Sequence, residues 1–184
     1  TTEIYTLSLH DALPISQVSD AFKSEARLIG QFIAENGHTL IYGGATGGLM
    51  DAVAEATHEL GGEIIGVVPD LIVEKGRKSD LPTQTFQVET MSERKELMKE
   101  YADVFVVLAG GFGTLDELFD VVASGMVGYH DKQTILVNSD DYFAGLLQQI
   151  DRMTAEGLGY KAREAGLHMC QSAEECTAWL AEQE

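Results

Sequence analysis

Short apolar runs alternate with helical patterns along most of the chain, and this alternation constrains the fold more than any other feature of the sequence. The most apolar run, residues 104–108 (VFVVL), leads directly into a glycine-rich turn, and residues 39–42 lead into another. Apolar strands that are each followed by a helix are typical of a parallel sheet with helices on both faces. The sequence therefore predicts an α/β fold, a Rossmann-like doubly wound parallel sheet.

The expected elements follow from apolar runs, helix caps and glycine stops. Strands are expected at residues 39–42, 63–68, 85–88, 104–108, 134–137 and 167–170. Helices are expected over residues 19–36, 49–60, 90–101, 114–128, 142–156 and from 172 onward. Thr90 and Glu93 have the spacing of a capping box, as do Ser172 and Glu175, and each pair predicts the start of a helix.

Residues 1–16 do not fit the alternation. They show no clear period and supply no glycine-rich strand end, and residues 6–15 (TLSLHDALPI) match the translation of a common sequencing-adaptor oligonucleotide. We therefore expect residues 1–16 to be an atypical N-terminal segment, an assembly artefact in place of the true start, with a genuine divergent N-terminus as the alternative. Residues 17–184 are expected to form one domain.

The composition excludes several classes of partner. Lys and Arg number 12 against 30 Asp and Glu, and the net charge of -18 repels nucleic acid and anionic membrane surfaces. No apolar run approaches the ~20 residues of a membrane span, and no signal-peptide pattern opens the chain. Cys170 and Cys176 are too few to staple a domain of 184 residues, so we expect two free thiols and a cytoplasmic location.

Basic residues are concentrated in one stretch. Residues 74–100 contain six of the 12 Lys and Arg and an equal number of Asp and Glu, so the rest of the chain carries the whole net charge. A small anionic ligand would find its cations in this stretch. The alternative is a solvated helix with ion pairs along its own surface.

Two glycine clusters follow expected strands. Residues 43–48 (GGATGG) and 110–114 (GGFGT) each lie between a strand and a helix, and in a parallel sheet both turns belong to the carboxyl edge. Glycine lets the backbone approach an anion closely, and amides at a helix N-terminus attract phosphate. Neither cluster is a GxGxxG fingerprint or a Walker loop. Together they predict a phosphate or nucleotide site, with ordinary turns as the alternative.

Glu117 and Arg94 are the charged residues beside the second glycine cluster. Glu117 lies early in the helix that follows it, and its spacing from Thr114 would also suit a capping box with a purely structural role. Arg94 and Lys95 lie in the preceding helix. The alternatives for these two residues are a solvated surface position and a phosphate clamp with no catalytic part. The five histidines do not cluster, so we expect no metal site and no Ser-His-Asp triad.

Three motifs together resemble the LOG ("Lonely guy") proteins, cytokinin riboside 5'-monophosphate phosphoribohydrolases long mislabelled as lysine decarboxylases. They are GGxxxGLM at residues 43–50, MxxRK at residues 91–95 and GGFGTxxE at residues 110–117. The resemblance spans about residues 18–182 in organisation and is most specific over residues 91–117.

The resemblance implies a Rossmann-like homodimer that hydrolyses the N-glycosidic bond of adenine-type nucleoside monophosphates without a cofactor. The implied reaction releases a free base and ribose 5-phosphate and would serve cytokinin activation or nucleotide salvage. Arg94 and Glu117 match the catalytic pair of the family, and Lys95 its basic neighbour. The implied positions for binding substrate or phosphate are Gly43, Gly44, Gly48, Met91, Lys95, Gly110, Gly111, Gly113 and Thr114.

The chain departs from the family pattern in three places. Ala109 stands in place of proline, Asp51 in place of glycine, and the family's first strand with its Gly-Ser loop is expected to be absent. A sheet without a central strand leaves backbone groups unpaired, so we expect reduced stability.

Two other functions are compatible with the same architecture. The chain could be a carrier that holds a phosphorylated cofactor such as molybdenum cofactor without turnover, but a carrier does not need the Glu117 carboxylate. Decarboxylation with pyridoxal phosphate is disfavoured, because none of the seven lysines lies in a recognisable cofactor motif.

Overall fold

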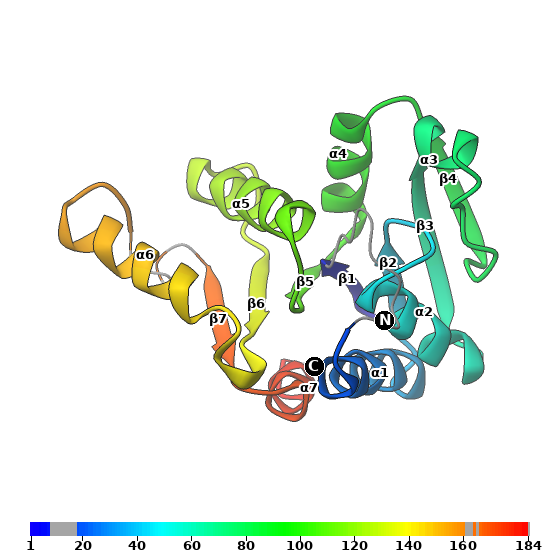
Figure 1. Cartoon of the computed structure of the whole chain (residues 1–184), viewed down its shortest axis with the longest axis horizontal. Coiled ribbons are helices and arrows are strands. Elements are labelled where there is room, and N and C mark those ends of the chain that lie inside the picture. The colour runs from blue at the N-terminus through cyan, green and yellow to red at the C-terminus, as the bar shows by residue number, and fades with distance from the viewer. Residues whose placement is uncertain (8–17, 161–163, 165, 184) are drawn as a thin grey trace.

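A single parallel sheet forms the centre of the molecule in the computed structural model, which describes residues 1–7, 18–160, 164 and 166–183. The strand order is β4-β3-β2-β1-β5-β6-β7, and every neighbouring pair is parallel (Figure 1). The strands are β1 (Glu3–Leu7), β2 (Thr39–Tyr42), β3 (Glu63–Pro69), β4 (Gln84–Val88), β5 (Val104–Val107), β6 (Gln133–Val137) and β7 (Leu167–Cys170).

Helices cover both faces of this sheet, which confirms the doubly wound α/β fold. The α-helices are α1 (Asp20–Glu35), α2 (Leu49–Glu59), α3 (Asp70–Glu74), α4 (Met91–Tyr101), α5 (Phe112–Val127), α6 (Ala144–Ala155) and α7 (Ala173–Ala181). One buried cluster joins the sheet to α1, α2 and α7, and a second joins the other face to α4, α5 and α6 (Figure 1). The continuous apolar strands are therefore buried on both sides, as their composition predicts.

The expectation that the first strand is absent is wrong. Residues 3–7 form β1 at the centre of the sheet, paired with β2 on one side and β5 on the other. Ile4 faces the α1 side and Tyr5 the α4 side, and both are buried. A strand this short places only a few side chains on each face of the sheet, and these are too few to show as a period in the sequence. The reduced stability expected from a missing strand loses its basis.

Most of the adaptor-like stretch lies outside the described residues. The residues outside the description include 8–17, the position at which the family has its Gly-Ser loop. The expected absence of that loop therefore lies outside the described residues. The division into an atypical segment at residues 1–16 and a domain at residues 17–184 stays a prediction.

The helix starts agree with the caps read from the sequence, with one shift that bears on function. The Thr90 side chain accepts the Glu93 amide at 3.1 Å, and the Glu93 carboxylate accepts the amide of Glu89, one residue before the cap. Helix α5 begins at Phe112 with Gly111 as its N-cap, two residues earlier than expected. Thr114 therefore lies inside the helix and does not cap it.

Cys170 and Cys176 are free thiols, as expected, and both are buried. None of the helices within the described ranges has the length and apolar composition needed to cross a membrane.

The bend between β6 and α6 contains two non-glycine residues in the left-handed region. Asp140 has a φ of 54° and Asp141 a φ of 53°, within a single turn of 3-10 helix at residues 139–141. This conformation is unfavourable for side chains with a Cβ and is readily adopted by glycine.

We predict that Asp140→Gly stabilises the protein, because glycine removes this backbone strain and the Asp140 side chain is exposed. The expected net gain is about 0.5–1 kcal/mol, because the relieved strain exceeds the conformational entropy that glycine adds to the unfolded chain, and for a domain of this size it raises Tm by about 2 °C in a thermal melt. Asp151→Gly in the interior of α6 is the matched control and should lower Tm. A lower Tm for Asp140→Gly would contradict the prediction.

Candidate active site

The carboxyl edge of the sheet has a topological switch point between β1 and β5. The connections after β1 and β2 run to α1 and α2 on one face, and the connections after β5 and β6 run to α5 and α6 on the other. In open α/β sheets a ligand binds in the crevice at such a point. The two glycine turns follow β2 and β5, the strands on either side of β1, so they share this edge as predicted.

Arg94 and Glu117 meet between α4 and α5. The distance from Arg94 Nη2 to Glu117 Oε1 is 3.1 Å, and the two side chains are only 2% and 1% exposed. Arg94 lies in the first turn of α4, which follows β4, and Glu117 in the second turn of α5, which follows β5. The capping-box interpretation of Glu117 is therefore wrong, because its carboxylate pairs with Arg94 and the N-cap of α5 is Gly111, not Thr114.

Several polar atoms of this pair have no well-aligned hydrogen bond. Arg94 Nη1 contacts the Met91 sulfur at 3.8 Å, but Arg94 Nε, Arg94 Nη2 and both Glu117 carboxylate oxygens lack an aligned partner among the described residues. Native proteins satisfy most buried polar groups, and the exceptions concentrate where a ligand or a reaction uses them. The pair thus has unused hydrogen-bonding capacity.

Burial raises the pKa of the Glu117 carboxyl above its ordinary value. The Arg94 guanidinium and the nearby Tyr5 hydroxyl oppose this rise, because both favour the charged carboxylate. A carboxyl group with a raised pKa exchanges a proton more readily near neutral pH than an exposed glutamate does. Glu117 is therefore suited to acid–base chemistry or to stabilising a cation.

The first glycine turn packs directly against Arg94. A Cβ on Gly43 would overlap the Arg94 guanidinium, and a Cβ on Gly44, whose φ is +59°, would overlap the Val68 side chain. These contacts explain why glycine occupies both positions. They also join the end of β2 to the ion pair.

An acidic side chain, Asp51, lies in the first turn of α2. The Gly47 amide donates to the Asp51 carboxylate at 2.5 Å, and the N-cap residue Gly48 has a φ of 73°. Asp51, a departure from the family pattern, thus places a negative charge beside the first glycine turn.

The second glycine turn exposes the start of α5 without a side-chain cap. Gly111 is the N-cap and makes no side-chain hydrogen bond, so the first amides of α5 remain available to an anion. The Thr114 hydroxyl is buried and has no partner among the described residues. A Cβ on Gly110 would overlap this hydroxyl, and the Gly110 carbonyl accepts the Tyr142 hydroxyl at 2.8 Å. Gly113 lies in the first turn of the helix.

Lys95 lies near the site, but its charge is directed at α5. Its ammonium is 3.1 Å from Asp116 Oδ2 and 3.8 Å from Asp120 Oδ1. Of the predicted site residues, the structure brings Gly43, Arg94 and Glu117 together, and Met91 contacts Arg94 from the start of α4. Lys95 pairs instead with its acidic neighbours. Lys99 pairs with Asp120 of α5 at 2.9 Å and with Glu96 of its own helix at 3.1 Å, and of these two pairs only the one with Glu96 is of the kind that the alternative interpretation predicts.

Sequence reasoning missed two residues that shape the site. Tyr5 was not recognised because β1 was not, and the contact of Tyr142 with Gly110 joins residues 32 positions apart. Asp51 was noted only as a departure. Its position in the first turn of α2 was a usable signal, because acidic residues there favour contact with free amides.

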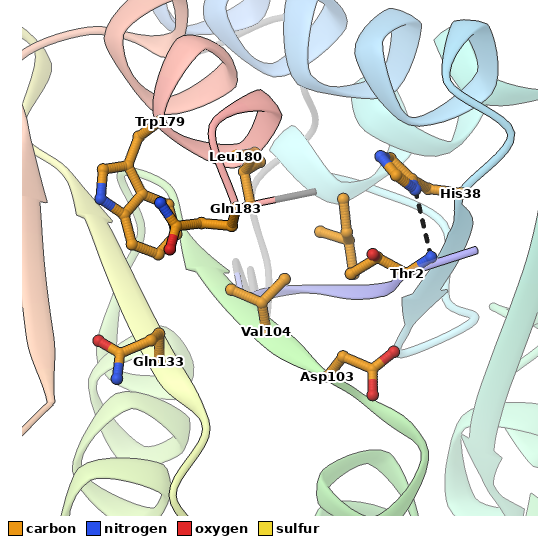
Figure 2. Close-up of a pocket in the computed structure, with 9 residues that line it drawn as sticks. Thr2, His38, Asp103, Val104, Gln133, Trp179, Leu180 and Gln183 are labelled. Carbon is orange, nitrogen blue, oxygen red and sulfur yellow. Dashed lines mark hydrogen bonds between the residues drawn. The ribbon is translucent and has the colours of Figure 1, made fainter.

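Another pocket lies at the opposite edge of the sheet. Figure 2 shows this pocket, whose volume is about 200 Å³, with Thr2, His38, Asp103 and Gln133 around it. These residues precede or begin their strands, so the pocket is at the amino edge and contains no expected site residue. Across the described ranges, no group of three or more His, Cys, Asp and Glu side chains could hold a metal ion.

The fold and the site define a class of protein. It is a doubly wound α/β protein with two glycine turns and a buried arginine–glutamate pair at the carboxyl edge of a parallel sheet. Comparisons with known proteins identify the class further.

A family model described as "Possible lysine decarboxylase" matches residues 50–180. Cytokinin riboside 5'-monophosphate phosphoribohydrolase LOG5 of Arabidopsis thaliana is 36% identical over 138 residues, 75% of this chain and 60% of the relative. The phosphoribohydrolase of Mycobacterium tuberculosis (strain ATCC 25618 / H37Rv) is 41% identical over 118 residues, 64% of this chain and 63% of the relative. The chain thus spans about 60% of the length of these relatives. It belongs to this family, the LOG family that its motifs resemble.

Solved structures with the same fold include two molybdenum cofactor proteins. The binding protein from Rippkaea orientalis has a TM-score of 0.72 at 21% identity, covering 98% of this chain and 96% of that one. The carrier protein from Chlamydomonas reinhardtii has a TM-score of 0.68 at 21% identity, with the same coverage. At this level of identity the likeness shows the fold alone.

We predict that Gly43→Ala breaks the Arg94–Glu117 pair, because the added methyl group takes the place of the guanidinium. Leaving a buried charge without its partner should lower the free energy of unfolding by about 3 kcal/mol in urea denaturation. Gly111→Ala is the matched control, since a Cβ there meets nothing within 4 Å, and its effect should stay within about 1 kcal/mol. Equal losses in the two variants would contradict the prediction.

Proposed function

We propose that the protein hydrolyses the N-glycosidic bond of adenosine 5'-monophosphates, with or without an N6 substituent, to a free base and ribose 5-phosphate. The observation that carries this proposal is the buried Arg94–Glu117 pair beside two glycine turns. Support also comes from relatives named phosphoribohydrolases that are 36% and 41% identical to this chain. The reaction needs only the nucleotide and water, and we propose that it takes place in the cytoplasm without a cofactor.

The N-terminus of α5 is the proposed phosphate site. Its first amides and the helix dipole attract an anion, and the buried Thr114 hydroxyl supplies a further donor. The Asp51 carboxylate repels a phosphate from the N-terminus of α2. The ribose would then lie between the two turns, within reach of Arg94 and Glu117.

Glu117 is the proposed catalytic carboxylate. As the bond between C1′ and the base nitrogen breaks, positive charge builds on the ribose, as in the oxocarbenium-like states of glycoside hydrolysis. An ionised Glu117 stabilises this cation and accepts a proton from the water that attacks C1′. The leaving base takes a proton on its nitrogen from solvent, and Glu117 returns to solvent the proton that it accepted from water, so the products balance substrate plus water.

Arg94 is proposed to keep Glu117 ionised and to hold the phosphate or the ribose hydroxyls. Its Nε and Nη2 atoms have no aligned partner among the described residues and can donate to a substrate. Because Arg94 and Glu117 are almost fully buried, a nucleotide reaches Glu117 only when the groups that cover the pair move. Binding and opening of the site are therefore coupled in this proposal.

The decarboxylase description of the family does not suit the residues of this site. Pyridoxal phosphate needs a lysine to form a Schiff base, and Lys95, the lysine of the site motif, is paired with Asp116 and Asp120. The alternative function, a carrier of a phosphorylated cofactor such as molybdenum cofactor, is compatible with the same fold. A carrier would hold its ligand without turnover, and this distinguishes it from the hydrolase.

We predict that Glu117→Gln lowers the release of free base at least about 100-fold, because it removes the proton acceptor. The wild-type protein is incubated with AMP and with N6-isopentenyl-AMP, and the free base is measured by chromatography. Asp116→Asn is the matched control, since it removes the neighbouring, 58% exposed carboxylate, and it should keep most of the activity. Tight nucleotide binding without product in the wild type would support the carrier and contradict the hydrolase.

We also propose that the protein is a homodimer through α5 and α6. Leu118 and Val121 of α5 belong to the core, but Met126 and Val127 are 45% and 75% exposed. An apolar groove of about 250 Å³ between α5, α6 and the segment after α6 contains Met126 and Leu158. Core packing thus accounts for Leu118 and Val121, and the proposed interface would account for Met126 and Val127.

We predict that Met126→Glu shifts the protein from dimer to monomer in size-exclusion chromatography with light scattering, because it buries a charge in the proposed interface. Leu71→Glu on α3 is the control, because Leu71 is similarly apolar and 55% exposed but lies away from the groove. A monomeric wild type, or a dimeric Met126→Glu variant, would contradict this interface.

A further inference from the structure

We propose that Tyr5 is a positioning residue for Glu117: its hydroxyl donates to the carboxylate and holds it in the ionised form beside Arg94. As a role in the reaction this inference rests on the proposed function. The contact between the two side chains does not, and it can be tested without a substrate.

Tyr5 comes from the strand at the centre of the sheet and points to the face covered by α4 and α5. Its side chain is 1% exposed, and its ring packs edge-on against Phe105 with a centroid distance of 5.7 Å and an angle of 71° between the planes. Both rings belong to the buried cluster on this face. The ring is therefore fixed, and the direction of the hydroxyl is fixed with it.

Tyr5 and Glu117 line the same small cavity between β1, α4 and α5. The Tyr5 hydroxyl and both carboxylate oxygens of Glu117 are buried without an aligned hydrogen-bond partner among the described residues. Catalytic hydrogen bonds are often loose before a substrate is bound and tighten afterwards. A buried hydroxyl without an acceptor is unfavourable, so a purely structural position would be better filled by phenylalanine.

The charged groups around Glu117 come from the two helices that flank it. Helix α4 contributes Arg94, Lys95 and Lys99, and α5 contributes Asp116 and Asp120. Lys99 and Lys95 pair with the aspartates, at 2.9 Å for Lys99–Asp120. The lysine charges are thus directed at the aspartates, whereas the Tyr5 hydroxyl has no aligned partner among the described residues and favours the charged carboxylate.

The direction of the effect follows from the charges. Burial, and then the negative charge of Glu117, raise the pKa of Tyr5 well above its ordinary value, so the hydroxyl keeps its proton wherever the protein is folded. A donor to the carboxylate favours its charged form and lowers its pKa. Removing this donor should therefore raise the pKa of Glu117, and less carboxylate should be present at a given acidic pH.

The chain contains a matched control. Tyr42 lies on the neighbouring strand β2 and is also buried, but its side chain belongs to the cluster on the opposite face of the sheet. Its hydroxyl faces Ser79 and Asp51, and burial raises its pKa to about 12. Tyr42→Phe thus removes the same group from an equally buried site that does not touch Glu117.

The test is an NMR titration of the Glu117 side-chain carboxyl carbon in wild type, Tyr5→Phe and Tyr42→Phe, with Glu117→Gln to assign the signal. We expect Tyr5→Phe to raise the midpoint by about one pH unit, a tenfold change in proton affinity, and Tyr42→Phe to leave it unchanged. The same midpoint in Tyr5→Phe and wild type, or an equal shift in both Phe variants, would overturn the assignment.

Activity separates this inference from the proposed function. If the wild type releases base from AMP, the acid limb of the kcat profile should move to higher pH in Tyr5→Phe by the same amount as the NMR midpoint, with KM little changed. A shift in KM alone would contradict the positioning role. If the wild type releases no base, the proposed function fails, and the titration still decides whether Tyr5 controls Glu117.

Discussion

The ion pair between Arg94 and Glu117 is the interaction on which the arrangement of the site depends. Two charges that are 2% and 1% exposed are tolerated only when they meet each other. This requirement fixes the spacing between α4 and α5 and leaves no room for a Cβ at Gly43. The ion pair thus constrains the end of β2, both helices and the face of β1. The polar atoms of the pair that have no aligned partner among the described residues are those that the proposed nucleotide substrate would contact.

Six of the seven strands could be predicted from the sequence, and β2, β3 and β5 are the clearest because they are largely apolar and lead into glycine or proline. The exception is β1, in which Ile4 and Tyr5 face opposite sides and the alternation covers only five residues. Its place in the sheet depends on pairing with strands 30 to 100 residues away. Local pattern carries no record of such partners, so the central strand was the one that sequence reasoning lost.

The site was predictable in its types of residue and less so in its contacts. The position of the glycine turns follows from sheet topology, whereas the pairing of Arg94 with Glu117 is implied only by the resemblance to the LOG family. The spacing of Thr114 and Glu117 was ambiguous, and the α5 N-cap at Gly111 decides between its two interpretations. Lys95 shows the limit of motif reasoning, because its partners Asp116 and Asp120 become neighbours only when α4 and α5 pack together.

The position of β1 has a mechanical consequence. Within the sheet, β4-β3-β2 and β5-β6-β7 have no hydrogen bonds to each other and are joined only through these five residues. The two glycine turns belong to different halves, one after β2 and the other after β5. Five residues thus fix the spacing between the two halves, and with it the separation of the two glycine turns.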